Sequence, residues 1–210
     1  MYNSKSNLII GFHGCDEKVQ KTLLNQPNKI QGSGKPYDWL GHGMYFWENN
    51  YERALQWAKD KEKRGEISKA AVVGAVISLD YCFDLTDTNF INQLTQYFEL
   101  MKEEYNQINK KLPENKNVKQ DKNKDLLLRD LDCAVIEFMH QRISEEIEKD
   151  LKMKGFSDYK VFDTTRGLFT EGGAAFPGAG IQKKNHIQIC IRNNNCIKGF
   201  FLPRKSIAFP

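Results

Sequence analysis

The chain has 210 residues, of which 40% are hydrophobic and 11% are aromatic. This length suits one domain, and the composition supports an ordinary packed core and excludes an intrinsically disordered chain. The formal net charge of +4 is a mild excess, compatible with an anionic partner such as nucleic acid but not diagnostic of one.

The N-terminus and the cysteines predict a cytoplasmic protein. The first fifteen residues hold a short apolar patch and no small-residue cleavage site, so we expect no signal peptide. No apolar run reaches the length of a membrane span, and we expect no membrane partner. The five cysteines are an odd number without a CxxC pair, which favours a reduced chain with no metal site.

Strand and helix signals alternate over the first eighty residues. Asp16 is typical of a helix N-cap, and residues 26–44 read as a long loop that forms a cleft because it still holds aromatic residues. The predicted elements are a strand over 7–13, a helix over 17–25, an amphipathic helix over 50–64 and a buried strand over 70–79.

The middle of the chain predicts a helical insertion over about 86–154. Two helices are expected over 88–111 and 124–154, with a polar loop between them. In the second helix apolar residues repeat at helical spacing, and the polar residues between them are typical of a solvated face.

Strand signals return after Gly155. They occupy 159–167, 186–193 and 197–203, and a glycine-rich loop over 171–185 reads as mobile and exposed. Strands at both ends with helices between them favour an α+β fold over alternating strand–helix units.

The first candidate site residue is His13. Alternation along the predicted strand puts it on the face opposite Leu8, Ile10 and Phe12, and we expect that apolar face to line the core. His13 thus ends a strand beside Gly14, where a ligand can approach the backbone closely. The alternative is a structural histidine with satisfied hydrogen bonds.

The second motif is Gly-His-Gly at 41–43, followed by Met and then Tyr-Phe-Trp. Aromatic residues behind a glycine-rich turn can form a stacking platform for a flat ring. The alternative is an aromatic cluster in the core, which is the favoured interpretation for Phe46. The segment lacks the strand–turn–helix spacing of a dinucleotide fingerprint, so we exclude a Rossmann site.

The third motif is the predicted strand 186–193. Its two faces are Ile187, Ile189 and Ile191 on one side and His186, Gln188, Cys190 and Arg192 on the other. A glutamine in mid-strand, framed by isoleucines, is a candidate site residue.

Together the three motifs resemble the diphtheria-toxin-like, or poly(ADP-ribose) polymerase-like, branch of the ADP-ribosyltransferase superfamily. The match is GFHG at 11–14, GHGMYF at 41–46 and HIQI at 186–189, and it covers roughly 1–65 and 155–205. The resemblance implies one domain over 1–210, with a split, twisted, mainly antiparallel β-sheet that binds NAD. It also implies a His-Tyr-Gln variant of the family's His–Tyr–Glu triad.

The resemblance implies binding roles for several residues. His13 would bond to the adenosine ribose, the backbone of Gly14 would bond to the nicotinamide carboxamide, and Tyr45 would stack on the nicotinamide ring. Gly43 belongs to the same binding motif.

Two further positions complete the implied NAD site. The family has a second aromatic residue under the nicotinamide, and here either Tyr51 or Trp57 could serve. Arg166 would bind a phosphate of NAD or of the acceptor, because its fork suits phosphate oxygens. The alternative for Arg166 is a structural ion pair with Asp163 or another acid.

The catalytic position falls on Gln188, where the family's full motif has glutamate. A glutamine can bond to a ribose hydroxyl but carries no charge and cannot accept a proton. Loss of a general base costs about 10²–10⁴ in rate, so we expect single transfer rather than polymer elongation. Gln188 would orient the ribose while the leaving nicotinamide does most of the work, or Glu171 would act as the base; otherwise Glu171 is a solvated loop carboxylate.

These implications predict a mono-ADP-ribosyltransferase that uses NAD as co-substrate, without a metal, and modifies a protein or a nucleic acid. By analogy, a lone transferase domain suggests a toxin of a toxin–antitoxin or phage-defence system, with an antitoxin partner. One alternative is an inactive module that binds NAD or ADP-ribose. Another is a nucleic-acid-binding protein without NAD chemistry, which the lysine-rich stretch 109–124 motivates. The positive charge favours a nucleic-acid acceptor.

Overall fold

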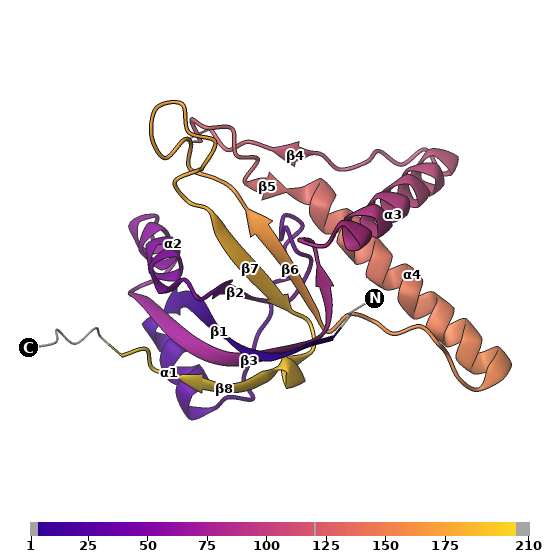
Figure 1. Ribbon diagram of the computed structural model, residues 1–210, viewed down its shortest axis with the longest axis horizontal. Coiled ribbons are helices and arrows are strands. Elements are labelled where there is room, and N and C mark those ends of the chain that lie inside the picture. Colours follow the sequence, from indigo (N-terminus) through magenta and orange to yellow (C-terminus); the bar gives the residue numbers. More distant parts are fainter. Residues whose placement is uncertain (1–3, 120, 205–210) are drawn as a thin grey trace, which may run out of the picture.

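The computed structural model describes residues 4–119 and 121–204, and its fold is α+β (Figure 1). The described residues form four α-helices and a twisted, mostly antiparallel sheet of six strands in the order β1-β2-β7-β6-β3-β8. A second, two-stranded sheet joins β4 and β5. The predicted α+β class is therefore confirmed.

The elements follow the predicted order. The strands are β1 (Ser4–Asp16), β2 (Met44–Glu48), β3 (Ala70–Asp84), β4 (Asn115–Lys116), β5 (Leu128–Arg129), β6 (Thr164–Phe169), β7 (His186–Ile191) and β8 (Ile197–Phe201). The helices are α1 (Glu17–Asn25), α2 (Tyr51–Lys63), α3 (Thr88–Gln107) and α4 (Asp130–Lys154), with a 3-10 turn at Asn194–Cys196. Asp16 caps α1 as predicted, because its carboxylate accepts the Lys18 amide. The β4–β5 hairpin is an addition to the prediction.

The strand pairings close a circuit. β1 pairs with β2 and β3, β2 pairs with β7, β7 pairs with β6, and β6 returns to β3. The β3–β6 pairing, over Cys82–Asp84, is the only parallel one among the described strands, and β8 pairs with β3 over Gly74–Ile77. Asp80 lies between these two stretches with φ of 46°, a left-handed conformation that interrupts the extended backbone of β3.

Outside the irregular positions of β1 and β3, the register of the pairings assigns the paired residues of the six-stranded sheet to one of two faces. Directly paired residues of antiparallel strands share a face. The face that we call the core face carries the largest apolar cluster, including Phe46, Ile77 and Ile189. The opposite face, which we call the site face, carries Tyr45 and, paired across β2 and β7, Trp47 and Gln188.

The predicted assignment of faces in β1 is wrong. Leu8 is 61% exposed, whereas Ile9 packs against the main core. The reason is Gly11, which shares the face of Ile9. A Cβ there would lie 2.6 Å from Ile77 Cδ1 and 2.9 Å from Phe46 Cβ, so the missing side chain lets these large residues fill the space over β1.

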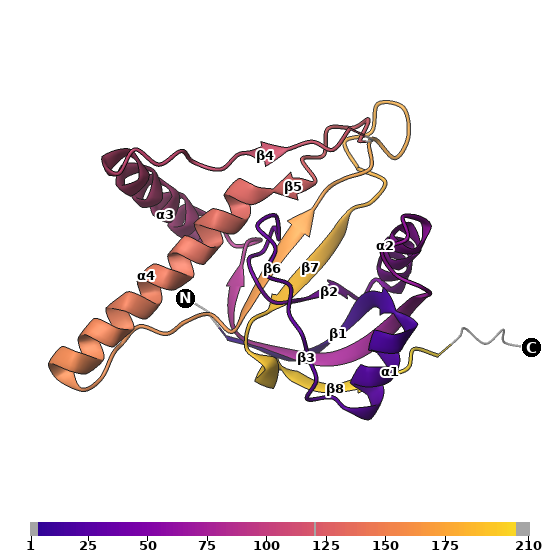
Figure 2. The same cartoon turned by 180° about the vertical axis from the view of Figure 1, so that it is seen from behind.

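The helical insertion packs against one end of the sheet. Figures 1 and 2 show α3 and α4 to one side of the strands, with the β4–β5 hairpin beside the loop between β6 and β7. Phe90 of α3 and Met139 of α4 join Phe83 and Phe162 in a second apolar cluster. The insertion therefore shares a core with the end of β3.

The contact between α2 and β1 generates the first prediction. A Cβ on Gly14 would overlap the backbone carbonyl of Ala54 in α2, and neither backbone can move without disturbing the sheet. We expect Gly14→Ala to lower the free energy of unfolding by about 3 kcal/mol, measured by chemical denaturation. The matched control is Gly199→Ala in β8, where nothing lies within 4 Å of the new Cβ. Equal stability of the two variants would contradict the packing.

Candidate functional site

Two segments cover the site face of β2 and β7. On one side α2 packs Ala54 against Trp47. On the other side residues 35–41, which we call the strap, pack Leu40 against Phe169 of β6. The polar residues of interest lie between these two covers.

Gln188 is buried beneath the strap, with 4% of its surface exposed. Its Oε1 accepts a hydrogen bond of 2.6 Å from Trp39 Nε1. The Trp39 ring stacks on Phe169 with a centroid distance of 3.5 Å, and the Arg129 guanidinium lies 4.7 Å from the same ring. The carboxamide is therefore held in one orientation, and a ligand hydroxyl would compete with Trp39 for its oxygen.

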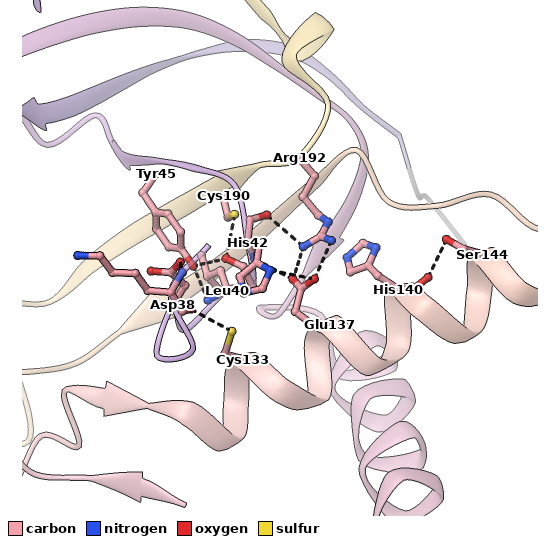
Figure 3. Close-up of polar contacts among 12 residues, drawn as sticks. Asp38, Leu40, His42, Tyr45, Cys133, Glu137, His140, Ser144, Cys190 and Arg192 are labelled. Atoms are coloured by element: carbon pink, nitrogen blue, oxygen red, sulfur yellow. Dashed lines mark hydrogen bonds and ion pairs between the residues drawn. The ribbon is translucent and has the colours of Figure 1, made fainter. Parts of the chain in front are cut away.

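Tyr45 holds the strap in place. Its hydroxyl donates to the Gly41 carbonyl at 2.7 Å and accepts from the Leu40 amide at 2.9 Å (Figure 3). Burial, together with the nearby Cys190 thiol, raises the pKa of Tyr45 far above its ordinary value, so the phenol is neutral. Its ring shares the site face with Gln188.

His13 lies on the other face. It shares the core face with Phe46, whose ring centroid is 5.8 Å away, because Phe12 is the residue that pairs with Trp47. Its Nδ1 donates to the Tyr45 carbonyl at 2.7 Å, and burial lowers its pKa, which favours the neutral imidazole. The structure thus links His13 to Tyr45 through the β2 backbone and does not place it beside Gln188.

Glu171 is buried, with 7% of its surface exposed, so the prediction of an exposed loop is wrong at this residue. Its Oε1 accepts from Arg53 Nη2 of α2 at 2.5 Å and lies 3.9 Å from His186 Nδ1. The tip of the same loop is exposed, as the prediction has it, with Phe176 and Ile181 directed to solvent. The Arg53 ion pair joins the start of the loop to α2.

Three buried polar atoms near Glu171 have no hydrogen-bond partner among the described residues: His186 Nε2, Trp47 Nε1 and Arg53 Nε. The His186 and Trp47 rings lie 6.3 Å apart. Burial lowers the pKa of His186 to about 4, so the imidazole is neutral at pH 7. An unpaired buried polar group costs about 1–3 kcal/mol, so this gathering marks a place where a polar ligand group would be stabilised.

The two glycines predicted to bind NAD have packing roles here. Gly14 lies directly beneath the α2 backbone. A Cβ on Gly43 would overlap the Ile191 carbonyl of β7, so Gly43 allows the turn before β2 to lie against that strand.

The two candidate aromatic residues of α2 lie apart. Tyr51 packs edge-on against Phe12 at 5.7 Å and is half-exposed. Trp57 lies 5.5 Å from Trp47, the residue that pairs with Gln188. By these contacts Trp57 belongs to the surroundings of Gln188, and Tyr51 lies one strand away.

Arg166 forms an ion pair on the core face. Its Nε donates to Glu48 at 2.6 Å and its Nη1 to Asp84 at 3.1 Å. Asp163 instead accepts from Asn193 at 2.8 Å. These contacts fit the alternative in which Arg166 forms a structural ion pair, with Glu48 and Asp84 as its partners.

Helix α4 of the insertion is hydrogen-bonded to the Gly-His-Gly turn at residues 41–43. Glu137 Oε1 accepts the His42 amide at 2.7 Å, and Arg192 Nη1 bonds to both Glu137, at 2.5 Å, and the His42 carbonyl, at 3.1 Å (Figure 3). The adjacent His140 is 6% exposed, and burial lowers its pKa to about 4. The prediction of a solvated polar face on α4 is therefore wrong for Glu137 and His140.

Several residues of this arrangement were not assigned a role from the sequence: Trp39, Arg53, Glu137 and His186. Strand alternation places His186 on the face of Gln188, and the long loop was noted for its aromatic residues, so weak signals exist for His186 and Trp39. Arg53 and Glu137 look like any charged residue on an amphipathic helix, and only the folded chain shows their partners.

The described residues contain no group of three or more His, Cys, Asp or Glu side chains arranged to hold a metal ion. All five cysteines are buried. Within the described ranges no helix has the length and apolar character needed to cross a membrane. Comparisons of the chain with protein-family models, curated proteins and solved structures find no match.

The hydrogen bond between Glu137 of α4 and the His42 amide can be tested by mutation. We expect Glu137→Ala to lower the free energy of unfolding by about 1–3 kcal/mol, because it leaves Arg192 and the His42 amide without their acceptor. Hydrogen exchange of the His42 amide should become at least about tenfold faster, since each factor of ten corresponds to about 1.4 kcal/mol of lost protection. Glu148→Ala, at an exposed position of the same helix, is the control. If both variants exchange alike, α4 does not hold the turn.

Proposed function

We propose that the protein transfers a single ADP-ribose from NAD to a macromolecular acceptor, on a sheet of the ADP-ribosyltransferase type. The observation that carries the proposal is the strand order β1-β2-β7, in which the three motif strands are consecutive neighbours. Tyr45 and Gln188 share the site face of β2 and β7. Strands β2 and β7, which are more than a hundred residues apart in the sequence, thus lie side by side. An NAD site built from these motifs requires that arrangement.

In the proposed reaction the bond between the nicotinamide nitrogen and C1 of the ribose breaks. Nicotinamide leaves with the bonding electron pair, and positive charge develops on the ribose ring. The Gln188 oxygen accepts from a ribose hydroxyl and fixes the sugar, but it supplies no full negative charge. An oxygen or nitrogen of the acceptor then bonds to C1, and its proton passes to the Glu171 carboxylate.

The position of Glu171 supports its role as the base. It is a buried carboxylate held by Arg53, close to His186, and His186 shares the site face with Gln188 two residues along β7. Packing of this kind fixes the carboxylate at the start of an otherwise exposed loop. His186, neutral because burial lowers its pKa to about 4, leaves the carboxylate without a competing cation from this strand.

Trp39 controls access in this proposal. Its indole occupies the Gln188 oxygen, so NAD has to displace it before the ribose can bond there. The backbone of the strap is held at Leu40 and Gly41 by the Tyr45 hydroxyl, so in this proposal the Trp39 side chain leaves Phe169 and Gln188 while the strap backbone stays in place.

A second candidate is a module that binds NAD or ADP-ribose without turnover. The observation that favours it is the uncharged Gln188 carboxamide, whose oxygen already has a partner within the protein. The two candidates differ in the release of nicotinamide.

The test is incubation with NAD labelled in the adenosine half, with nicotinamide release measured in parallel. We expect label on a macromolecule and one nicotinamide released per transfer. Gln188→Ala should reduce turnover by at least about tenfold while NAD affinity stays within about threefold, because the residue acts on the developing ribose charge. Gln188→Glu, which restores the missing charge, should raise turnover by about 10².

The control is Gln141→Glu, the same substitution at an exposed position of α4. NAD binding without nicotinamide release, in the wild type and in Gln188→Glu alike, would establish the binding module instead. Absence of NAD binding would overturn both candidates.

A further inference from the structure

A hollow of about 480 Å³ opens beside Arg53, next to the Arg53–Glu171 ion pair. It is lined by Asn50, Glu52, Arg53, Leu55, Gln56, Lys59, Lys183 and Asn185. Three of these side chains are cationic, three are amides that can donate hydrogen bonds, and one is acidic. The lining therefore suits an anionic group.

Arg53 connects the hollow to the candidate site. Its Nη2 is bonded to Glu171 and its Nη1 to Gln56, while its Nε is buried without an acceptor among the described residues. The guanidinium is thus positioned by two partners, and its positive charge contributes to the lining of the hollow. An anion bound here lies one side chain away from the carboxylate that we propose as the base.

Lysines without an ion-pair partner in the described part of the chain line the hollow and also occur on the rest of the β6–β7 loop and around the β4–β5 hairpin. They are Lys59 of α2, Lys183 and Lys184 of the β6–β7 loop, and Lys116, Lys119, Lys122 and Lys124 around the β4–β5 hairpin. None of these ammonium groups has an ion-pair partner within residues 4–119 and 121–204, although other lysines of the chain do. We call this set the lysine rim.

The two loops of the lysine rim lie side by side, as Figures 1 and 2 agree. Asp125 Oδ2 accepts the Gly172 amide at 2.8 Å, and Asn123 lies against Gly173. Asp121 accepts the amides of Asn123 and Asp125. Backbone hydrogen bonds therefore hold Asp121 and Asp125 in place, and neither carboxylate forms an ion pair with a lysine of the rim among the described residues.

An exposed aromatic residue lies on the β6–β7 loop, which also carries Lys183 and Lys184. Phe176, at the tip of the β6–β7 loop, is 61% exposed. Cationic side chains along a path, combined with an exposed aromatic ring, are the two features with which proteins bind single-stranded nucleic acids, through phosphates and stacked bases respectively.

We propose that the acceptor is a single-stranded nucleic acid, bound along the lysine rim with one of its phosphates in the hollow beside Arg53. This inference rests on the proposed function for the identity of the transferred group, but the binding surface is independent of it. The strand delivers a nucleophile near Glu171, which takes the proton when that atom bonds to C1 of the ribose.

Binding is tested without NAD, by fluorescence anisotropy of labelled single strands of about 12 nucleotides, the size that one such surface covers. DNA and RNA strands form separate arms, over about 50 to 200 mM salt. The test variant is Lys59→Ala with Lys183→Ala. The control is Lys29→Ala with Lys152→Ala, two exposed lysines without ion-pair partners outside the lysine rim.

We expect the test variant to bind at least about tenfold more weakly than the wild type, as loss of charge-assisted hydrogen bonds predicts. The slope of log K against log salt should become less steep by about 1.4, because two phosphate contacts are lost. The control should stay within about twofold of the wild type. Phe176→Ala should weaken binding by about fivefold or more through lost stacking.

Unchanged affinity of the test variant would overturn the inference, as would equal binding of a duplex or of a poly-glutamate peptide. Label transfer from NAD to proteins, without binding of either strand, would overturn the inference and leave the proposed function standing. Binding of a strand with the expected losses, but without nicotinamide release, would support the surface and contradict the transferase.

Discussion

The short strand β2 is the element on which the arrangement depends, because it pairs with β1 on one edge and with β7 on the other. Three residues of this strand contact different parts of the molecule. Phe46 enters the main core, Trp47 supports α2, and the Tyr45 carbonyl receives His13 while its hydroxyl holds the strap. A shift of β2 by one residue would exchange the two faces and separate all of these contacts.

Support for the candidate site runs outward from this strand in a chain of contacts. Glu137 and Arg192 fix the turn before β2, the turn and Tyr45 fix the strap, and the strap places Trp39 over Gln188. The helical insertion is therefore linked to Gln188 through the turn before β2 and the strap. In the proposed transferase, this coupling makes the insertion part of the machinery that positions the catalytic strand.

The elements of the fold could be predicted because their signals are local: the Asp16 cap, the helical spacing of α2 and α4, and the apolar run of β3. The faces of β1 could not, because they depend on Gly11 lying against Phe46, a contact between strands. The same limit applies to the site. Strand alternation identified Gln188, but the burial of Glu171 depends on Arg53, more than a hundred residues away in the sequence.

The proposed function requires that NAD binds to the site face of β2 and β7 after Trp39 has moved away from Gln188. A crystal structure of the unaltered protein with an NAD analogue whose bond to nicotinamide cannot break would show where NAD binds and whether the contact between Trp39 and Gln188 is lost. We expect the nicotinamide ribose beside Gln188, the Trp39 indole displaced from Phe169, and the Tyr45 hydroxyl still bonded to Gly41. NAD bound on another surface, or bound here with Trp39 unmoved from its stacked position, would contradict it.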